Sequence, residues 1–171
     1  EEVLKVFREG TARELKECVS EGLNFHCIQP FTAFETQGYE IFALPATHMR
    51  AEKALLYGIR KGDKALLYLN DTALLSESCY SYLADKGFCA EFVSFDCTLA
   101  DGEHKNSLRH MGFDENEGVR EKLLKYRIAK SGTKYCVTHF SHNAAPFRSR
   151  IEREAEKRGF YAAYDGAMFV F

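Results

Sequence analysis

Short apolar segments alternate with amphipathic ones along most of this sequence, and this alternation constrains the fold more than any other feature. We expect strands at residues 38–44, 54–59, 65–69, 90–95, 134–138 and 161–171, the last of them interrupted by Asp165-Gly166. Residues 24–34, which include Pro30, are expected to form a strand or an irregular crossing. Strands that alternate with helices indicate a layered α/β (α+β) architecture.

The amphipathic segments predict helices at residues 1–22, 76–86, 114–128 and 147–158, and Gly87 and Gly159 are suited to end two of them. The turn sequence at residues 61–64 joins the second and third strands into a hairpin. Residues 99–112 form a long polar loop, and such loops are often functional. The sequence contains no repeat and no proline-rich linker, so we expect a single domain over residues 1–171.

Composition and charge narrow the classes of partner. The net charge of −2 gives no electrostatic case for nucleic acid or an anionic membrane, and no apolar run approaches the roughly 20 residues that span a bilayer. The first residues lack the features of a signal peptide, and they lack a methionine, which suggests a processed or shortened chain. The six cysteines form no C-x-x-C pair, which favours reduced thiols in a cytoplasmic protein.

Polar residues that can bind metals follow four of the predicted strands. They are Thr47-His48, Asn70-Asp71-Thr72, Asp96-Cys97-Thr98 and Thr138-His139. Loops that leave strand ends converge on one edge of a sheet, and imidazoles together with carboxylates suit zinc, manganese or iron. A single histidine or aspartate at such a place is usually a surface residue or a turn residue. Their recurrence at one type of position favours a metal site.

The order of these motifs resembles the metallo-β-lactamase-fold phosphodiesterases over residues 35–171. The words that carry the resemblance are LPATH, ALLYLNDT, FVSFDCT, RHMGF, VTHFSHN and YDGAMFVF. The phosphoribosyl cyclic phosphate phosphodiesterases are the nearest group, and ribonuclease Z is a more distant one. The resemblance implies the C-terminal portion of an αββα metallo-β-lactamase sandwich. It also implies hydrolysis of a small, cyclic phosphodiester with two divalent metal ions, zinc or manganese.

The resemblance implies a role for each residue that matches a family motif. His48 corresponds to a ligand of the first metal, Asp71 to the aspartate that bridges both metals, and His139 to a ligand of the second. His110 corresponds to the general acid that protonates the leaving group. The others, Asp96, His142 and Asn143, correspond to residues that orient a ligand or contact the substrate.

One departure from the family is large. Its signature, His-x-His-x-Asp-His, is absent, which leaves His48 for one metal and Asp71 with His139 for the other. Because a tight site needs about three protein ligands per zinc, we expect this chain alone to bind metal weakly and to be inactive. The chain would then be a fragment, a degenerate homologue or a domain that takes ligands from a partner.

Other readings remain open. Half of a sandwich leaves apolar surface uncovered, which would favour a homo-oligomer. The domain could serve as a non-catalytic binding or scaffold module, or it could hydrolyse a thioester, a lactam or an RNA 3′ end on the same fold. Leu99 stands where some relatives have a histidine; we expect nearby His104 to be a solvated loop residue. If metal does bind this chain fully, His26, His104 or His142 would complete the centre.

Overall fold

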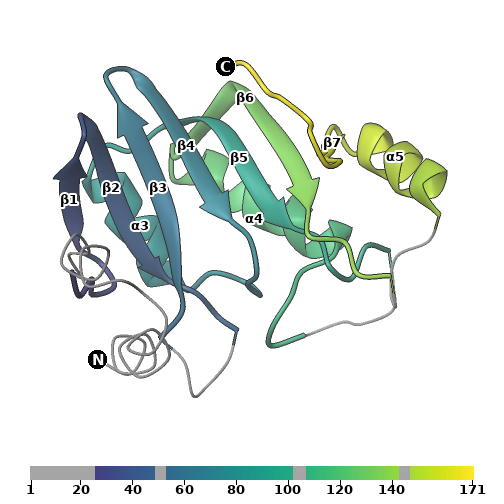
Figure 1. The fold of residues 1–171 in the computed structure, drawn as a ribbon, viewed down its shortest axis with the longest axis horizontal. Helices are drawn as coiled ribbons and strands as arrows, with labels where there is room; N and C mark the ends of the chain where they lie inside the picture. The colour runs from purple at the N-terminus through teal and green to yellow at the C-terminus, as the bar shows by residue number, and fades with distance from the viewer. Residues whose placement is uncertain (1–25, 49–52, 102–106, 143–146) are drawn as a thin grey trace, which may run out of the picture.

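The computed structural model describes residues 26–48, 53–101, 107–142 and 147–171, and its central feature is a single seven-stranded sheet (Figure 1). The spatial order of the strands follows their order in the sequence. Strands β1 to β4 pair antiparallel, and β4 to β7 pair parallel. The strands are β1 (Ala33–Thr36), β2 (Tyr39–Pro45), β3 (Leu55–Lys61), β4 (Lys64–Leu69), β5 (Ala90–Asp96), β6 (Ala129–Thr138) and β7 (Tyr161–Ala162).

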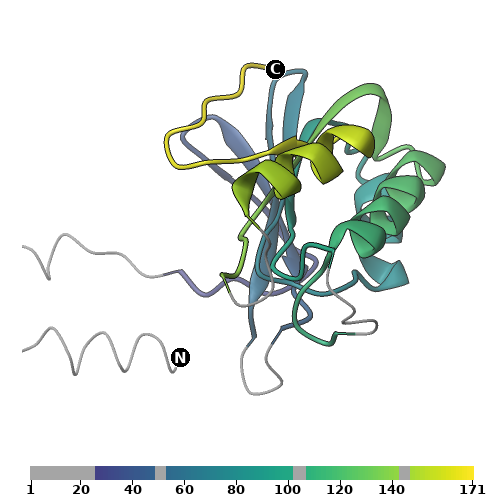
Figure 2. The same cartoon turned by 90° about the vertical axis from the view of Figure 1, so that its right-hand side faces the viewer.

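Each parallel connection contains a helix, as the alternating pattern predicts. Helix α3 (Glu77–Asp85) joins β4 to β5, α4 (Phe113–Lys125) joins β5 to β6, and α5 (Arg148–Lys157) joins β6 to β7. Figure 2 shows α3 and α4 on the same side of the sheet. Gly87 adopts a φ of +60° directly after α3, which is the left-handed conformation expected of a residue that ends a helix. The predicted helix at residues 1–22 lies outside the described residues.

The hydrophobic core lies between the sheet and helices α3 and α4. Alternate residues of the strands point to this side, because successive side chains of a strand point to opposite faces. The core includes Phe42, Leu44, Leu67, Leu69, Val93 and Phe95 from the strands and Leu83, Val119 and Leu123 from the helices. Burial of one such side chain contributes about 1.5–3 kcal/mol, so this layer fixes the position of the strands.

The opposite face of the sheet is also apolar. Ile41, Ile59, Leu66 and Phe92 are register partners in a row across β2 to β5. In the neighbouring row, Tyr68 lies on the fourth of seven strands and is 45% exposed. An antiparallel sheet with one solvated face normally carries polar side chains there. This apolar second face fits one half of a β-sandwich, as the resemblance implies.

The predicted C-terminal strand is wrong beyond its first two residues. Only Tyr161–Ala162 pairs with β6, and residues 163–171 make no ladder in the described structure. Phe169 and Phe171 pack their rings against Phe92, with ring centroids 5.1 and 5.0 Å away. Met168 and Val170, on either side of Phe169 in the sequence, are 92% and 86% exposed. The alternating pattern of this segment therefore reflects side-chain packing on the open face instead of strand pairing.

The boundaries of other elements differ less from the predicted ones. Strand β6 begins at Ala129, earlier than predicted, and its pairing with β5 shifts register between Ala90 and Phe92. The segment expected to be a strand or an irregular crossing supplies only the first residues of β1. Cys79, Cys97 and Cys136 are buried and free, as expected of reduced core thiols. None of the described helices is both long and apolar enough to cross a membrane.

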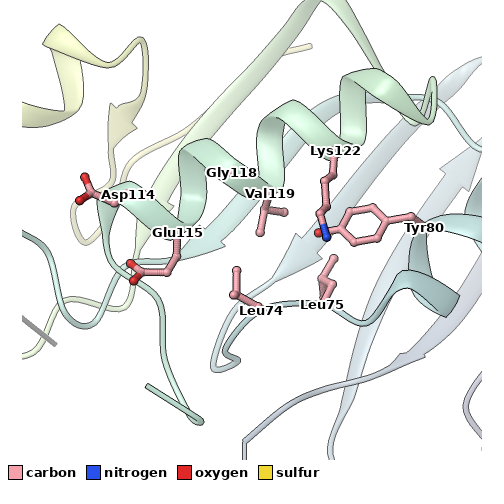
Figure 3. A pocket seen from close by; sticks show the side chains of 8 residues that line it. All are labelled: Leu74, Leu75, Tyr80, Asp114, Glu115, Gly118, Val119 and Lys122. Atoms are coloured by element: carbon pink, nitrogen blue, oxygen red, sulfur yellow. The ribbon is translucent and has the colours of Figure 1, made fainter. Parts of the chain in front are cut away.

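A groove of about 480 Å³ lies between α4, α3 and the segment that leads into α3 (Figure 3). Apolar side chains line it together with two carboxylates and an ammonium group. The lining residues are Leu74, Leu75, Tyr80, Asp114, Glu115, Gly118, Val119 and Lys122. None of the predicted site residues that the structure describes lines this groove, which is therefore separate from them.

The contact between Gly58 and the core generates a stability prediction. A Cβ atom at Gly58 would lie 2.9 Å from Cε2 of Phe88 and 3.4 Å from Cβ of Phe42. We expect Gly58→Ala to lower the free energy of unfolding by about 1–3 kcal/mol, because the ring must move in a packed core. Gly118→Ala is the control: this position in α4 has no atom within 4 Å of a Cβ, so the change should raise stability by up to about 1 kcal/mol. Urea unfolding measures both, and equal effects would contradict the packing argument.

Candidate metal centre

The candidate residues meet because four strands point the same way. Strands β2 and β4 each pair antiparallel with β3, and β5 and β6 extend the sheet in the direction of β4. The C-terminal ends of β2, β4, β5 and β6 therefore lie at one edge of the sheet. The polar motifs that follow these strands are gathered there, as the sequence predicts.

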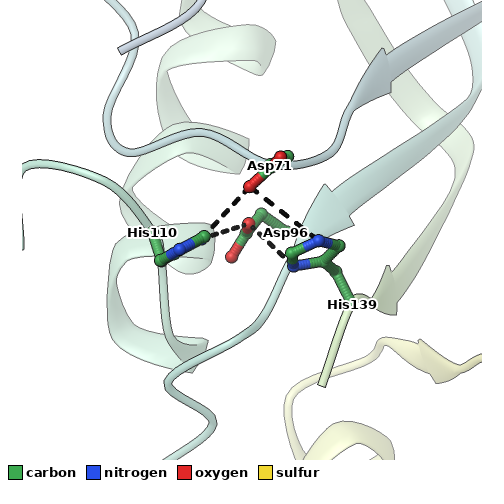
Figure 4. A group of neighbouring side chains, drawn as sticks. All are labelled: Asp71, Asp96, His110 and His139. Carbon is green, nitrogen blue, oxygen red and sulfur yellow. Dashed lines mark hydrogen bonds and ion pairs between the residues drawn. The ribbon is translucent and has the colours of Figure 1, made fainter. Parts of the chain in front are cut away.

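Four side chains form a compact cluster at this edge (Figure 4). They are Asp71 from the loop after β4, Asp96 from the end of β5, His110 from the loop before α4, and His139 directly after β6. One nitrogen or oxygen of each lies within 4.8 Å of the corresponding atoms of the others, which is close enough for a metal ion. The cluster combines two imidazoles with two carboxylates, a donor set that suits zinc, manganese or iron.

Asp96 is the buried member of the cluster, with a side chain that is 0% exposed. Its Oδ1 accepts hydrogen bonds from the backbone N–H groups of Thr98 at 2.9 Å and Met111 at 3.1 Å. Its Oδ2 lies 3.0 Å from Nδ1 of His110 and 3.4 Å from Nδ1 of His139. A carboxylate with this many partners is well suited to hold both imidazoles in place.

His110 is held from two sides. Its Nδ1 faces Oδ2 of Asp96, and its backbone N–H donates to Oγ of Ser107 at 3.1 Å. The carboxylate is an acceptor, so the hydrogen bond places the proton on Nδ1 of the neutral ring. Nε2 of His110 then carries the free lone pair of the neutral ring.

Asp71 is the exposed carboxylate of the cluster, with its side chain 50% exposed. Its backbone adopts a φ of +59°, a left-handed conformation that aspartate tolerates better than most residues. The neighbouring residues anchor it: Ser94 donates to Oδ1 of Asn70 at 2.8 Å, and the hydroxyl of buried Thr72 accepts from the Thr47 N–H at 3.0 Å. The open carboxylate is thus presented by a fixed loop.

His139 begins the loop after β6 and also has a left-handed φ, of +62°. Its Nε2 lies 3.8 Å from Oδ1 of Asp71. Its Nδ1 lies 2.7 Å from the hydroxyl of Thr98, which also contacts Nδ1 of His110 at 3.2 Å. Thr98 belongs to the DCT motif, but its role cannot be read from the sequence, because its contacts depend on how three loops meet.

His48 lies beside the cluster, after β2. Its Nδ1 is 3.5 Å from Oδ1 of Asp71 and 3.3 Å from the carbonyl oxygen of Arg109, and its ring is 5.0 Å from that of His110. The structure thus brings His48, Asp71, Asp96, His110 and His139 together.

The remaining candidates are not in this group. His142 and His26 are exposed residues outside the cluster, and Asn143 and His104 lie outside the described residues.

The nearby cysteines do not add a ligand. Cys97 follows Asp96 and is buried, and this burial, with the adjacent Asp96 carboxylate as a smaller cause, raises the pKa of its thiol. Burial likewise raises the pKa of Cys136 to about 11. Since the thiolate is the form that binds metal or attacks a substrate, neither side chain is suited to those roles near neutral pH.

Comparisons with known proteins identify the fold. No family model and no curated protein matches the sequence. Among solved structures, the metallo-β-lactamase fold protein YhfI from Bacillus subtilis matches with a TM-score of 0.64 and 17% identity, over 88% of this chain and 60% of YhfI. Zn²⁺-bound PqqB from Methylobacterium extorquens matches with a TM-score of 0.51 and 18% identity, over 85% of this chain and 55% of PqqB.

A third structure matches over a smaller part of its own length. CmlA from Streptomyces venezuelae, a diiron β-hydroxylase, has a TM-score of 0.53 and 12% identity, over 82% of this chain and 33% of CmlA. The chain therefore spans 60% or less of the length of all three structures. The chain thus forms a part of the metallo-β-lactamase fold.

Proposed function

We propose that this chain carries part of the active site of a metal-dependent hydrolase whose substrate is a small phosphodiester, such as a cyclic sugar or nucleotide phosphate. The observation that carries the proposal is the cluster of Asp71, Asp96, His110 and His139 at one edge of the sheet. Its members follow β4, β5 and β6 or precede α4, so four separate parts of the chain supply groups that can bind a metal.

The geometry of Asp71 and His139 fits a shared ion. Their Oδ1 and Nε2 atoms lie 3.8 Å apart, too far for a hydrogen bond. Two ligands of a tetrahedral zinc with bonds of about 2.0–2.1 Å lie roughly 3.3–3.4 Å apart, so a small adjustment would suffice. Nδ1 of His139 is already occupied by Thr98, which leaves Nε2 facing the carboxylate.

The ligand set within the described residues is incomplete for two ions. Asp71, His139 and His48 offer three ligand groups, and a catalytic zinc normally has about three of its own. We propose that the complete centre takes further ligands from chain that covers the apolar open face. The related structures contain substantial additional length, which supports this proposal.

The residues of this chain would then have separate roles in the reaction. When bound, a divalent ion supplies Lewis acidity towards water and towards a phosphoryl oxygen. Asp71 and His139 would hold it, and Asp96 orients His110 through Nδ1. His110, with its ring protonated, would donate the Nε2 proton to the leaving oxygen and return to the neutral Nδ1–H form, which is the role of a general acid.

A substrate panel tests the reaction class. The full natural protein is incubated with Zn²⁺ or Mn²⁺ and offered a cyclic sugar phosphate, a 2′,3′-cyclic nucleotide, a thioester, a lactam and an RNA 3′ end. We expect turnover of the cyclic phosphodiesters alone. Turnover of the thioester or lactam instead would contradict the proposed substrate but support the proposed hydrolase activity. Inactivity on the whole panel would contradict the proposed substrate and the proposed hydrolase activity.

The metal proposal predicts a loss of affinity on removal of a ligand. Loss of a residue that only hydrogen-bonds to a metal ligand typically weakens metal binding by about 10–100-fold. We expect Asp71→Ala and His139→Ala, which each remove a ligand, to weaken Zn²⁺ or Mn²⁺ binding by more than this. Isothermal titration calorimetry on the full natural protein measures the affinity. His26→Ala is the control, because His26 is exposed and outside the cluster. Unchanged affinity in Asp71→Ala would remove this carboxylate from the centre.

The acid role of His110 predicts a different pattern. We expect His110→Ala to lower kcat on a cyclic phosphodiester by about 10²–10⁴-fold, because the leaving oxygen must depart without a proton donor. Metal content, measured by elemental analysis, should stay at the wild-type value. A variant that loses metal together with activity would show that His110 is a ligand; full activity would exclude both roles.

A further inference from the structure

The hydroxyl of Thr98 joins the two imidazoles of the cluster. Its Oγ1 lies 2.7 Å from Nδ1 of His139, 2.9 Å from the carbonyl oxygen of His139 and 3.2 Å from Nδ1 of His110. The hydroxyl has one proton and two lone pairs. The carbonyl oxygen can only accept, so the proton of Thr98 is directed to His139 O, and the lone pairs face the imidazole nitrogens.

This arrangement leaves Nδ1 of His139 among acceptors. Its near neighbours are the lone pairs of Thr98 Oγ1 at 2.7 Å and the carboxylate oxygen Oδ2 of Asp96 at 3.4 Å. An unprotonated Nδ1 would be a third acceptor in contact with two others. The neutral imidazole therefore carries its proton on Nδ1 and has its free lone pair on Nε2, the atom that faces Asp71.

We propose that Thr98 is a positioning residue that selects the Nδ1–H tautomer of His139 and so presents Nε2 as the ligand atom. The same hydroxyl stabilises the backbone of His139, because it donates to the carbonyl of a residue whose φ is +62°. Thr98 is itself fixed, since its N–H donates to the buried carboxylate of Asp96 at 2.9 Å. One side chain thus sets both the orientation and the protonation site of His139.

The tautomer assignment stands apart from the proposed hydrolase. It concerns the metal-free protein, and it holds whether or not the chain acts on a phosphodiester. The consequence for metal affinity does rest on the proposed function. A test with one readout for each part therefore separates failure of the positioning role from failure of the metal centre.

The first readout is long-range ¹H–¹⁵N NMR of the histidine rings in metal-free protein at pH about 8.5, where a histidine is ordinarily neutral. We expect wild type and Thr98→Ser to show His139 as the Nδ1–H tautomer. Thr98→Val, which keeps the shape and removes the hydroxyl, should shift the tautomer ratio by about 2- to 10-fold towards Nε2–H, the range of one typical hydrogen bond. His26, exposed and outside the cluster, is the internal reference and should not change.

The second readout is calorimetric titration of the same three proteins with Zn²⁺. Thr98→Val should bind about 10–100-fold more weakly than wild type, and Thr98→Ser within about threefold of it. An Nε2–H tautomer of His139 in wild type would overturn the proposal, as would a Thr98→Val protein with unchanged tautomer ratio. If Thr98→Val does not fold, the wild-type and Thr98→Ser spectra decide alone. No Zn²⁺ binding by wild type, with the Nδ1–H tautomer present, would count against the metal centre only.

Discussion

The buried carboxylate of Asp96 is the constraint on which the rest of the site depends. A carboxylate removed from water is costly unless its lone pairs are filled, and this one receives two backbone N–H groups and lies against two imidazoles. The main-chain carbonyl of the same residue accepts from Nδ2 of Asn116, a buried side chain of α4. The end of β5, the loop before α4 and α4 itself are therefore coupled at one residue. The positions of His110 and His139 follow from that coupling.

The geometry around this carboxylate is maintained at the expense of local backbone preference. Asp71 and His139 both adopt left-handed φ values, a conformation that costs non-glycine residues roughly 1–3 kcal/mol when it is strained. Both are the first exposed polar residues after buried strands. Hydrogen bonds to Thr98 hold His139, and those of Asn70 and Thr72 hold the segment around Asp71. Strain at two positions that face each other is typical of a functional site, whose side chains must point in directions that a relaxed turn would not give.

The sequence pattern was reliable where it reflected burial and misleading where it did not. The hairpin and the helices α3 to α5 lie close to their predicted bounds, because their periodic apolar residues pack into the core. Residues 163–171 have a comparable alternation, yet their phenylalanines pack on Phe92 without pairing as a strand. A period of two cannot distinguish these cases, since both bring every second side chain against the same surface. The apolar open face is a second example, because the burial of its residues depends on whether another layer covers them.

The sequence by itself determined strands β2 to β6, helices α3 to α5 and the polar residues at the ends of β2, β4, β5 and β6. These depend on local periodicity and on the direction of the strands, both of which can be read from neighbouring residues. Only the tertiary structure decided how the candidate side chains face one another. The contact between Thr98 and His139 joins residues 41 positions apart, and no local pattern encodes it. Asp96 likewise gained its role from backbone groups of two separate segments, because hydrogen-bond geometry is set by how loops pack and not by the identity of the residues that they contain.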